Sequence, residues 1–469
     1  MEGVFDEKNS YYNSIDVDSL IIVDSKQEWN SFKMDKHPIQ GLESILESGR
    51  NIIDKDETSI LIEYSHQKRL SVTGAIINVV KLVLGSASFA IPYAFMQSGI
   101  IAGCIGMFVC AILVLFTVDL LLSARDQVQR IQSTNQNLTY ASIAAVSLGP
   151  HWSSVVKVAT AGSCLGACAG YVAFISGIVE DYSPFTFKQA CILLLPILIA
   201  LSLIRTWTHM TLWSALGNTA FACSMLAICA DAFRKLREKA AVESVLLWNT
   251  SLEAMKVRWK TVLLFFGPVF FLFCFHYCVI PLEQEMKEPK QFRRIVMPVA
   301  IGLCVVFNSF IGILCFLAYG DFTQGNVIRN VSQGPLVTGI CFGLAIDLLF
   351  TYCLMLAPAR EYIEAHMLQK LRLYGTPARL DTHVENFVRI TLVCITVAIA
   401  FAIPNFARIT GIVGGFTDMF QSAVLPPLIM AALLFSKQVR TQFALLCSFI
   451  AFLATIAMFL ITSQAILTP

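Results

Sequence analysis

Long apolar segments alternate with short polar ones from about residue 72 to residue 465. Most of the apolar segments are 20 residues or longer, and a bilayer core about 30 Å thick needs roughly 20 apolar helical residues to cross it. The pattern therefore predicts an all-α polytopic membrane protein. Its eleven predicted transmembrane helices cover roughly residues 72–97, 99–124, 152–179, 187–206, 209–231, 261–283, 295–319, 335–358, 386–406, 409–435 and 441–465.

The composition agrees with this pattern. Of the 469 residues, 56% are hydrophobic and 14% are charged, whereas a soluble domain has about 25% charged residues. We therefore exclude a soluble enzyme, a nucleic-acid-binding protein and a β-barrel. No paired carboxylates, nucleophile–base set or nucleotide motif indicates an enzyme.

Charge divides the chain into two parts. Residues 1–70 carry 14 acidic and 8 basic side chains, and residues 71–469 carry 18 acidic and 26 basic ones. The first part is rich in Asp, Ser and Asn and has no apolar run long enough for a signal peptide. We expect an acidic, disordered cytoplasmic tail in residues 1–70 and a transmembrane transporter domain in residues 71–469.

Lys and Arg near the helix ends give the expected orientation, because cytoplasmic loops carry an excess of them. With a cytoplasmic N-terminus, the cytoplasmic ends carry 17 of these residues and the opposite ends carry ten, of which seven lie in residues 232–260. This segment either is an outer loop that breaks the trend or indicates a miscounted helix. We expect the outer loop, which makes Asn249 and Asn330 candidate glycosylation sites.

The first predicted helix contains residues that favour a break. Gly85, Ser86, Ala87 and Ser88 interrupt an apolar run at mid-depth, and Pro92 follows. Local unwinding would turn N–H and C=O groups toward a cavity, as in transporters whose half-helix ends bind carboxylates and cations. The alternative is a proline kink in which a serine hydroxyl bonds back to the helix.

The sixth predicted helix offers a second break. It has Pro268 and Pro281 near its ends and His276 at its centre. An ionisable group at mid-membrane is a functional candidate by default, and histidine titrates near physiological pH. His276 is therefore a candidate for proton coupling, and the alternative is a histidine hydrogen-bonded between helices. Breaks five helices apart suit two inverted five-helix repeats.

Other helices carry small or ionisable residues. Glycines at four-residue spacing in residues 162–170 allow a close helix approach, and Tyr171 directly after them could reach a central cavity. Asp418 follows another glycine-rich run and is either a cation or proton group or a partner for Arg408. Cys164 lies four residues before another cysteine, but no histidine or third thiol is near in sequence, so we expect no metal site and no cofactor.

Several stretches resemble a known family: residues 78–92, 259–287, 319–321, 350–359 and 413–427. Their order and spacing resemble the amino acid/auxin permease family, and within it the proton-coupled amino acid transporter branch. The resemblance implies an eleven-helix version of the amino acid–polyamine–organocation fold, with inverted five-helix repeats and broken helices 1 and 6. It also implies that the substrate is held between those two helices.

The breaks and the resemblance together give the candidate substrate-binding residues, which are Asn78, Gly85, Ser86, Ala87, Tyr171, Phe273, Phe275, Tyr277, Thr351 and Tyr352. The sequence departs from the branch at some of them. Ala87 stands where the branch usually has Gly, and His276-Tyr277 stands where it usually has Glu-Gly. Phe116 replaces an expected histidine in helix 2, and the paired outer-loop cysteines are missing. The coupling residues therefore cannot be carried over, and His276 and Asp418 are the candidates.

We expect a secondary active carrier that moves small amino acids or related amine-carboxylates across the bilayer by alternating access. By resemblance, protons are favoured over sodium as the coupling ion. The alternative is a non-enzymatic amino-acid sensor that signals through the N-terminal tail.

Two short patterns in the tail bear on location. Residues 12–15 fit a tyrosine-based sorting pattern, and residues 56–61 loosely fit an acidic dileucine pattern. Sorting adaptors are therefore candidate partners, and we expect an endolysosomal or vacuolar membrane rather than the plasma membrane. The alternative is an unstructured tail that carries no sorting signal.

Overall fold

A computed structural model of the chain describes residues 70–132, 138–204, 210–242, 252–373, 381–436 and 441–468. Within these ranges the chain is almost entirely helical, and its one extended pairing is a β-bridge between Leu70 and Met286. Eight of the described helices are long and apolar enough to cross a membrane. The prediction of an all-α polytopic membrane protein is confirmed.

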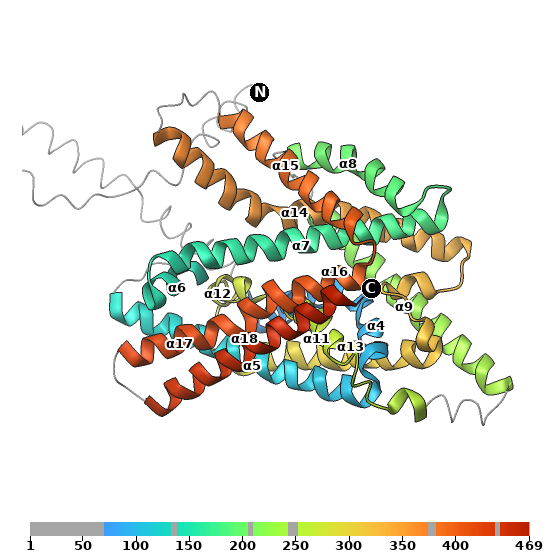
Figure 1. The fold of residues 1–469 in the computed structure, drawn as a ribbon, viewed down its shortest axis with the longest axis horizontal. Helices are drawn as coiled ribbons and strands as arrows, with labels where there is room; N and C mark the ends of the chain where they lie inside the picture. Colours follow the sequence, from blue (N-terminus) through green and yellow to red (C-terminus); the bar gives the residue numbers. More distant parts are fainter. Residues whose placement is uncertain are drawn as a thin grey trace, which may run out of the picture. The chain divides into compact units, whose positions relative to one another are not determined.

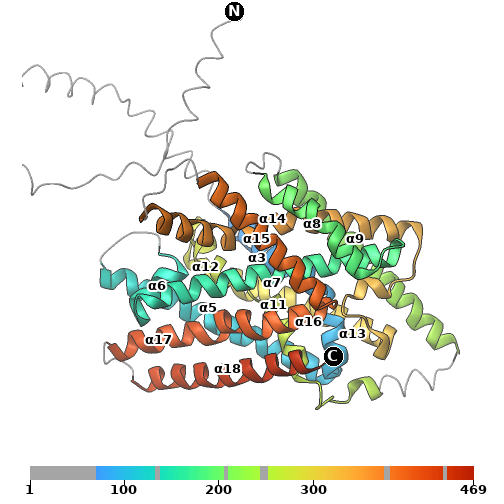
Figure 2. The ribbon, with the colours of Figure 1, turned by 45° about the horizontal axis from the view of Figure 1, so that its top comes forward.

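Helices occupy all eleven predicted segments (Figure 1). In chain order they are α3 (Val72–Val83) with α4 (Ile91–Ser98), α5 (Ile100–Gln132), α7 (His151–Tyr182), α8 (Phe187–Leu203), α9 (Met210–Val242), α11 (Leu263–Leu272) with α12 (His276–Gln284), α13 (Met297–Tyr319), α14 (Pro335–Leu373), α15 (Asp381–Ala402), α16 (Phe406–Val413) with α17 (Leu425–Ser436), and α18 (Thr441–Leu467). A short helix, α6 (Tyr140–Leu148), lies between α5 and α7. The last two helices, α17 and α18, run side by side in both views (Figures 1 and 2).

The first helix is broken where its small residues lie. α3 ends at Val83, the short 3₁₀ helix η2 (Ser86–Phe89) follows, and α4 begins at Ile91. Pro92 lies in the first turn of α4, where the missing N–H of proline would have no intrahelical partner. The break is therefore a true interruption between two half-helices.

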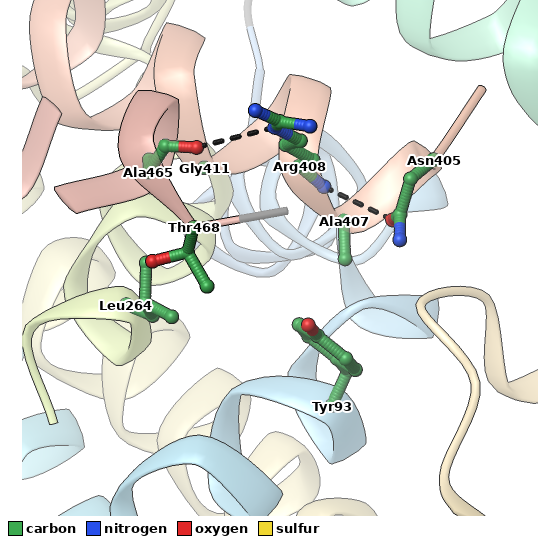
Figure 3. A pocket seen from close by; sticks show the side chains of 8 residues that line it. All are labelled: Tyr93, Leu264, Asn405, Ala407, Arg408, Gly411, Ala465 and Thr468. Atoms are coloured by element: carbon green, nitrogen blue, oxygen red, sulfur yellow. Dashed lines mark hydrogen bonds between the residues drawn. The ribbon is translucent and has the colours of Figure 1, made fainter. Parts of the chain in front are cut away.

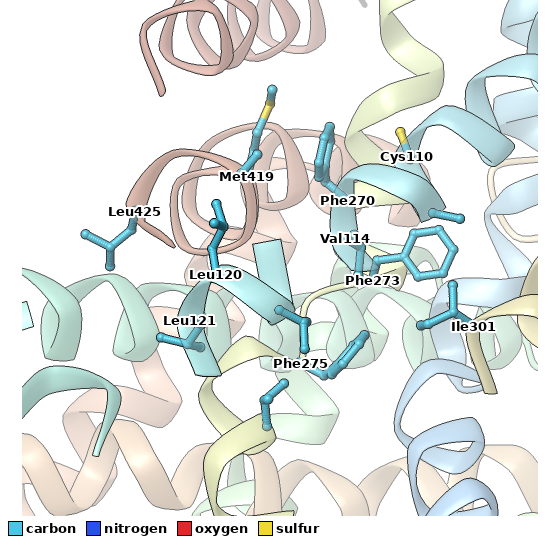
Figure 4. Close-up of a cluster of buried hydrophobic side chains, with 14 of the residues drawn as sticks. Cys110, Val114, Leu120, Leu121, Phe270, Phe273, Phe275, Ile301, Met419 and Leu425 are labelled. Carbon is cyan, nitrogen blue, oxygen red and sulfur yellow. The ribbon is translucent and has the colours of Figure 1, made fainter. Parts of the chain in front are cut away.

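The sixth helix is broken at residues 273–275, between α11 and α12. Pro268 and Pro281 lie inside the two half-helices, so the prolines flank the break and do not form it. Phe273 and Phe275 are 0% and 2% exposed, and both belong to an apolar cluster that includes side chains of α5 and α13 (Figure 4). Burial of these two rings in the core anchors the non-helical segment.

Polar residues mark where several helices begin. Thr139 before α6 and Thr186 before α8 each form a capping box, and the Asn405 side chain accepts a hydrogen bond from the first turn of α16. The first N–H groups of a helix have no intrahelical partner, so such side chains fix the starting residue.

The α11 half-helix crosses the tenth helix in backbone contact. A Cβ atom at Gly414 would lie 1.9 Å from the carbonyl oxygen of Gly267, and one at Gly267 would lie 2.4 Å from the carbonyl oxygen of Gly411. A Cβ atom at Gly166 of α7 would lie 2.4 Å from the side chain of Val413. Glycines of the third and tenth helices thus permit close packing, as their pattern indicates.

The described part of residues 232–260 lies at the same helix end as the chain that follows α13. Lys235 Nζ donates to the carbonyl oxygen of Asn330 at 3.1 Å, and Lys239 Nζ donates to that of Ala318 at 2.7 Å. An unbroken count of eleven helices puts these segments at one end. The basic residues Arg234 to Lys239 form the last turns of α9, and the position of the segment on the outer side stays a prediction.

Arg329 ties the connection between α13 and α14 to the end of α7. Its guanidinium donates to Asp181 at 2.6 Å and to Glu180 at 3.0 Å. The hydrogen bond with Asp181 raises the pKa of Arg329. Two carboxylates on one guanidinium hold this connection in place.

At the opposite helix end, the chain before α3 is joined to the chain after α12. Leu70 N donates to the carbonyl oxygen of Glu285 at 2.8 Å, and Lys287 N donates to that of Leu70 at 3.0 Å. Close by in sequence, buried Glu283 of α12 pairs with Arg125 of α5. α12 is thus attached to two other segments at this end.

Candidate functional site

The two helix breaks meet at one cavity of about 90 Å³. Both breaks, α7, α12, α14 and the tenth helix line it. Six of the ten predicted substrate-binding residues are among the lining residues: Gly85, Ser86, Ala87, Tyr171, Phe275 and Tyr277. We call this space the central cavity.

A second cavity of about 500 Å³ adjoins the central cavity. Gly85, Ser86, Tyr171 and Tyr277 line both spaces and therefore form the boundary between them. The larger cavity also has Thr351 of α14 in its wall. Ligand pockets usually measure about 300–1,000 Å³, so the larger cavity falls in that range and the central cavity does not.

The half-helix ends lie at the wall of the central cavity. Leu82 and Val83 at the end of α3 and Leu272 at the end of α11 line it, together with Ala87 of η2. The last carbonyl groups of a helix and the first N–H groups of the next lack intrahelical partners. Such an arrangement can hold both a cationic and an anionic group of one ligand.

Asp418 lines the central cavity from the tenth helix. It lies at the end of the π-helical stretch η7 (Gly414–Asp418), which is followed by a second one, η8 (Phe420–Val424). π-Helical turns are frequent at functional sites. The Ser163 hydroxyl of α7 donates to Oδ1 of Asp418, and Oδ2 has no hydrogen-bond partner among the described residues.

Arg408 does not serve as the partner of Asp418 in this structure. Its guanidinium donates to the carbonyl oxygens of Ala465 at 3.3 Å and Ile466 at 2.6 Å, at the end of α18. Figure 3 shows Arg408 in a separate small cavity that Tyr93 also lines. The structure therefore does not support an Arg408–Asp418 pair, and Asp418 as a cation or proton group stays a prediction.

His276 lies in the protein core behind the central cavity. Its side chain is 0% exposed, and Nε2 lies 3.0 Å from the Thr117 hydroxyl oxygen of α5. Nδ1 has no hydrogen-bond partner among the described residues. His276 is not part of the wall of either cavity described above, and its role in proton coupling stays a prediction.

Three predicted substrate-binding residues do not line these two cavities. Asn78 is half-buried on α3, Phe273 is fully buried in the apolar cluster of Figure 4, and the Tyr352 hydroxyl oxygen lies 2.6 Å from that of Thr396 on α15. Their place in substrate binding stays a prediction.

Asp347 stands out in the sequence of the eighth helix but was not among the predicted site residues, and neither was Ser163. Ser163 lies inside the small-residue stripe of α7 and reads as packing, yet it binds Asp418 at the central cavity. Asp347 lines the larger cavity from α14. An ionisable residue inside an apolar helix was the available signal for Asp347.

Of the two glycosylation candidates, Asn330 lies within the described residues and Asn249 does not. Asn330 Nδ2 donates to the carbonyl oxygen of Phe322 at 2.8 Å, and its Oδ1 accepts from Gln324 N at 2.7 Å. A glycan on Nδ2 would have to fit beside these bonds, so Asn330 stays a prediction.

Comparison with known proteins gives matches over most of the chain. Residues 68–467 match a family model described as "Transmembrane amino acid transporter protein". Among similar proteins, amino acid transporter AVT3A of Arabidopsis thaliana is 24% identical over 362 residues, which cover 75% of this chain and 79% of the relative. Amino acid transporter ANT1 of the same organism is 26% identical over 364 residues, 74% of this chain and 82% of the relative.

Solved structures give weaker matches. MhsT in complex with L-phenylalanine has 13% identity and a TM-score of 0.48, over 84% of this chain and 98% of that chain. The inward-facing conformation of Mhp1 has 13% identity and a TM-score of 0.49, over 85% of this chain and 92% of that chain.

Proposed function

The chain belongs to the transmembrane amino acid transporter family, and we propose that it is a secondary active carrier that moves small amino acids or related amine-carboxylates across a membrane by alternating access. One observation carries this proposal: the breaks of the first and sixth helices open onto the same cavity. Half-helix ends at a shared cavity are a general device for holding a charged solute inside a membrane protein.

The substrate's two charged groups are assigned to opposite helix ends. The ammonium group lies near the carbonyl ends of α3 and α11, where the helix dipoles are negative. The carboxylate lies near the N–H groups at the start of η2 and α12. Ala87 and Tyr277 line the cavity, and their bulk favours a small substrate side chain.

Movement of the boundary residues is part of the proposal. The central cavity of about 90 Å³ is smaller than a usual ligand pocket. A bound amino acid therefore either extends into the larger cavity or displaces Tyr171 and Tyr277, which line both spaces. Displacement of these rings would connect the substrate to one side of the membrane, as alternating access requires.

Protons are the proposed coupling ion, and an endolysosomal or vacuolar membrane is the proposed location. The family resemblance of the sequence supports proton coupling, and a buried carboxylate at the central cavity supports a group that can take up a proton. In an acidic compartment, the proton gradient would drive amino acids out toward the cytosol.

Uptake by purified protein in liposomes tests this proposal. Labelled amino acids are offered one at a time, with and without a pH gradient, and empty liposomes give the background. We expect saturable uptake of a subset of amino acids, and a higher uptake when the side that holds the amino acid is the more acidic. Saturable binding without any uptake would contradict the proposal and favour the amino-acid sensor.

A further inference from the structure

Asp418 is a buried carboxylate at the central cavity without a cation beside it. Its side chain is 0% exposed. Ser163 of α7 and Thr417 of the same helix donate to Oδ1, and Oδ2 has no hydrogen-bond partner among the described residues. Among the described residues, no Lys, Arg or His forms an ion pair with it. An ionised carboxylate in such a place is strongly disfavoured unless a cation lies beside it. Without a cation, the group is favoured in its protonated, neutral form.

The groups that face Asp418 are weakly acidic or neutral. The first helix and α14 contribute uncharged residues to the central cavity. The titratable groups from the other packed elements are the thiols of Cys164 of α7 and Cys274 of the sixth-helix break and the phenols of Tyr171 of α7 and Tyr277 of α12. None of these groups carries a positive charge, so the cavity itself gives Asp418 no counter-ion.

The chemistry around Asp418 favours a proton over a metal cation. Hard cations are held by several oxygen ligands, and thiols are suited to softer metals. The side-chain hydroxyl oxygens that donate to the carboxyl group are those of Ser163 and of Thr417, which lies 3.4 Å from Oδ1. A proton needs no coordination shell and binds Oδ2 directly.

Charge balance links this proton to the substrate. A zwitterionic amino acid has no net charge, so it leaves an ionised Asp418 uncompensated when the cavity closes around both. We infer that Asp418 is the residue that carries the coupled proton, an inference that rests on the proposed function. On the acidic side, cavity water gives a proton to Oδ2, and the neutral carboxyl group crosses with the substrate. On the less acidic side, the proton returns to water and the carboxylate is restored.

The test compares two kinds of transport in liposomes that contain Asp418→Asn or wild type. The amide cannot take up the proton but keeps the shape of the protonated side chain. We expect Asp418→Asn to lose pH-gradient-driven accumulation, which for one proton per substrate reaches about tenfold per pH unit in the wild type. Exchange of labelled for unlabelled amino acid without a gradient should stay within about threefold of wild type, because substrate binding is kept.

The matched control is Asp321→Asn, the same chemical change at a side chain that is 73% exposed and paired with Arg258. It should accumulate substrate like the wild type. If Asp418→Asn elutes as an aggregate in size-exclusion chromatography, Asp418→Ser is measured instead, because its smaller side chain leaves room for water.

Other outcomes separate the inference from the proposed function. Full accumulation by a folded Asp418→Asn protein overturns the inference, and a loss of accumulation in His276→Gln alone would move the proton to His276. Loss of exchange in a folded Asp418→Asn protein would make Asp418 a substrate ligand, which also overturns it. Accumulation driven by a sodium gradient at equal pH would do the same. A wild type that exchanges no amino acid overturns both proposals.

Discussion

At the scale of single residues, Gly85 connects the first-helix break to both cavities. It lines the central and the larger cavity, and a Cβ atom added to it would meet no heavy atom within 4 Å. The open space beside it is therefore the proposed substrate space. Gly85→Val should reduce uptake at least about tenfold by occupying this space, since each tenfold loss is only about 1.4 kcal/mol of transition-state free energy. Initial uptake rates in liposomes, normalised to the reconstituted protein, measure the effect.

The control for this variant is Gly302→Val on α13. A Cβ atom at Gly302 also meets nothing within 4 Å, but this glycine is exposed and lines neither cavity. It should transport like the wild type. Normal uptake by Gly85→Val would contradict the assignment of the substrate site to the first-helix break.

The candidate site could be predicted only in part, and neighbouring residues show why. Thr351 lines the larger cavity, whereas Tyr352 turns away to Thr396. Successive residues of a helix point about 100° apart, so a motif that names both cannot say which one faces the cavity. Ser163 was missed because a small polar residue in a glycine stripe is usually a packing residue.

At the scale of elements, the sequence predicts the helix breaks but does not predict where α-helical hydrogen bonding changes to π-helical hydrogen bonding. Small residues and Pro92 identify the first break, and the ends of the breaks agree with the pattern within a few residues. The π-helical stretches that present Asp418 have no signal in hydropathy, which reports burial and not the partner of each N–H. α14 continues to Leu373, beyond the apolar run that ends near residue 358, because a helix can extend into polar sequence outside the bilayer.

The crossing of α11 and the tenth helix gives a prediction about stability. Gly414→Ala would place a Cβ atom 1.9 Å from the carbonyl oxygen of Gly267, so two backbones must separate. Overpacking of this kind costs about 1–3 kcal/mol or more. We expect a lower unfolding temperature or a loss of folded protein, measured by size-exclusion chromatography after heating in detergent.

Gly302→Ala is the control for the crossing, because its Cβ atom would meet nothing within 4 Å. It should keep the unfolding temperature of the wild type. An unchanged unfolding temperature for Gly414→Ala would mean that the two helices do not touch at this point in the membrane.

At the scale of the whole molecule, the N-terminal tail is proposed to determine in which cellular membrane the protein resides. The sorting patterns of the tail lie outside the described residues. If adaptors read them, Tyr12→Ala combined with Leu61→Ala should shift a fluorescently tagged protein from endolysosomal membranes to the cell surface. Confocal microscopy with organelle markers measures the shift.

Two results would remove the proposed location. One is a wild-type protein that already resides at the cell surface. The other is a double variant that stays in the same membrane as the wild type. Substitution of Asn13 and Ile60 with Ala is a poor control because both lie inside the same patterns. Ser25→Ala and Ser31→Ala, in the same tail but outside them, should not move the protein.

The β-bridge between Leu70 and Met286 has a mechanical consequence. It joins the N-terminal end of α3 to the C-terminal end of α12 through two backbone hydrogen bonds, and the other end of each half-helix lies at the central cavity. We therefore expect the two half-helices to move together as one body, with the helix breaks as the hinges. A tilt of α3 would then displace α12 with it, which would give the first and sixth helices one shared degree of freedom at this end of the molecule.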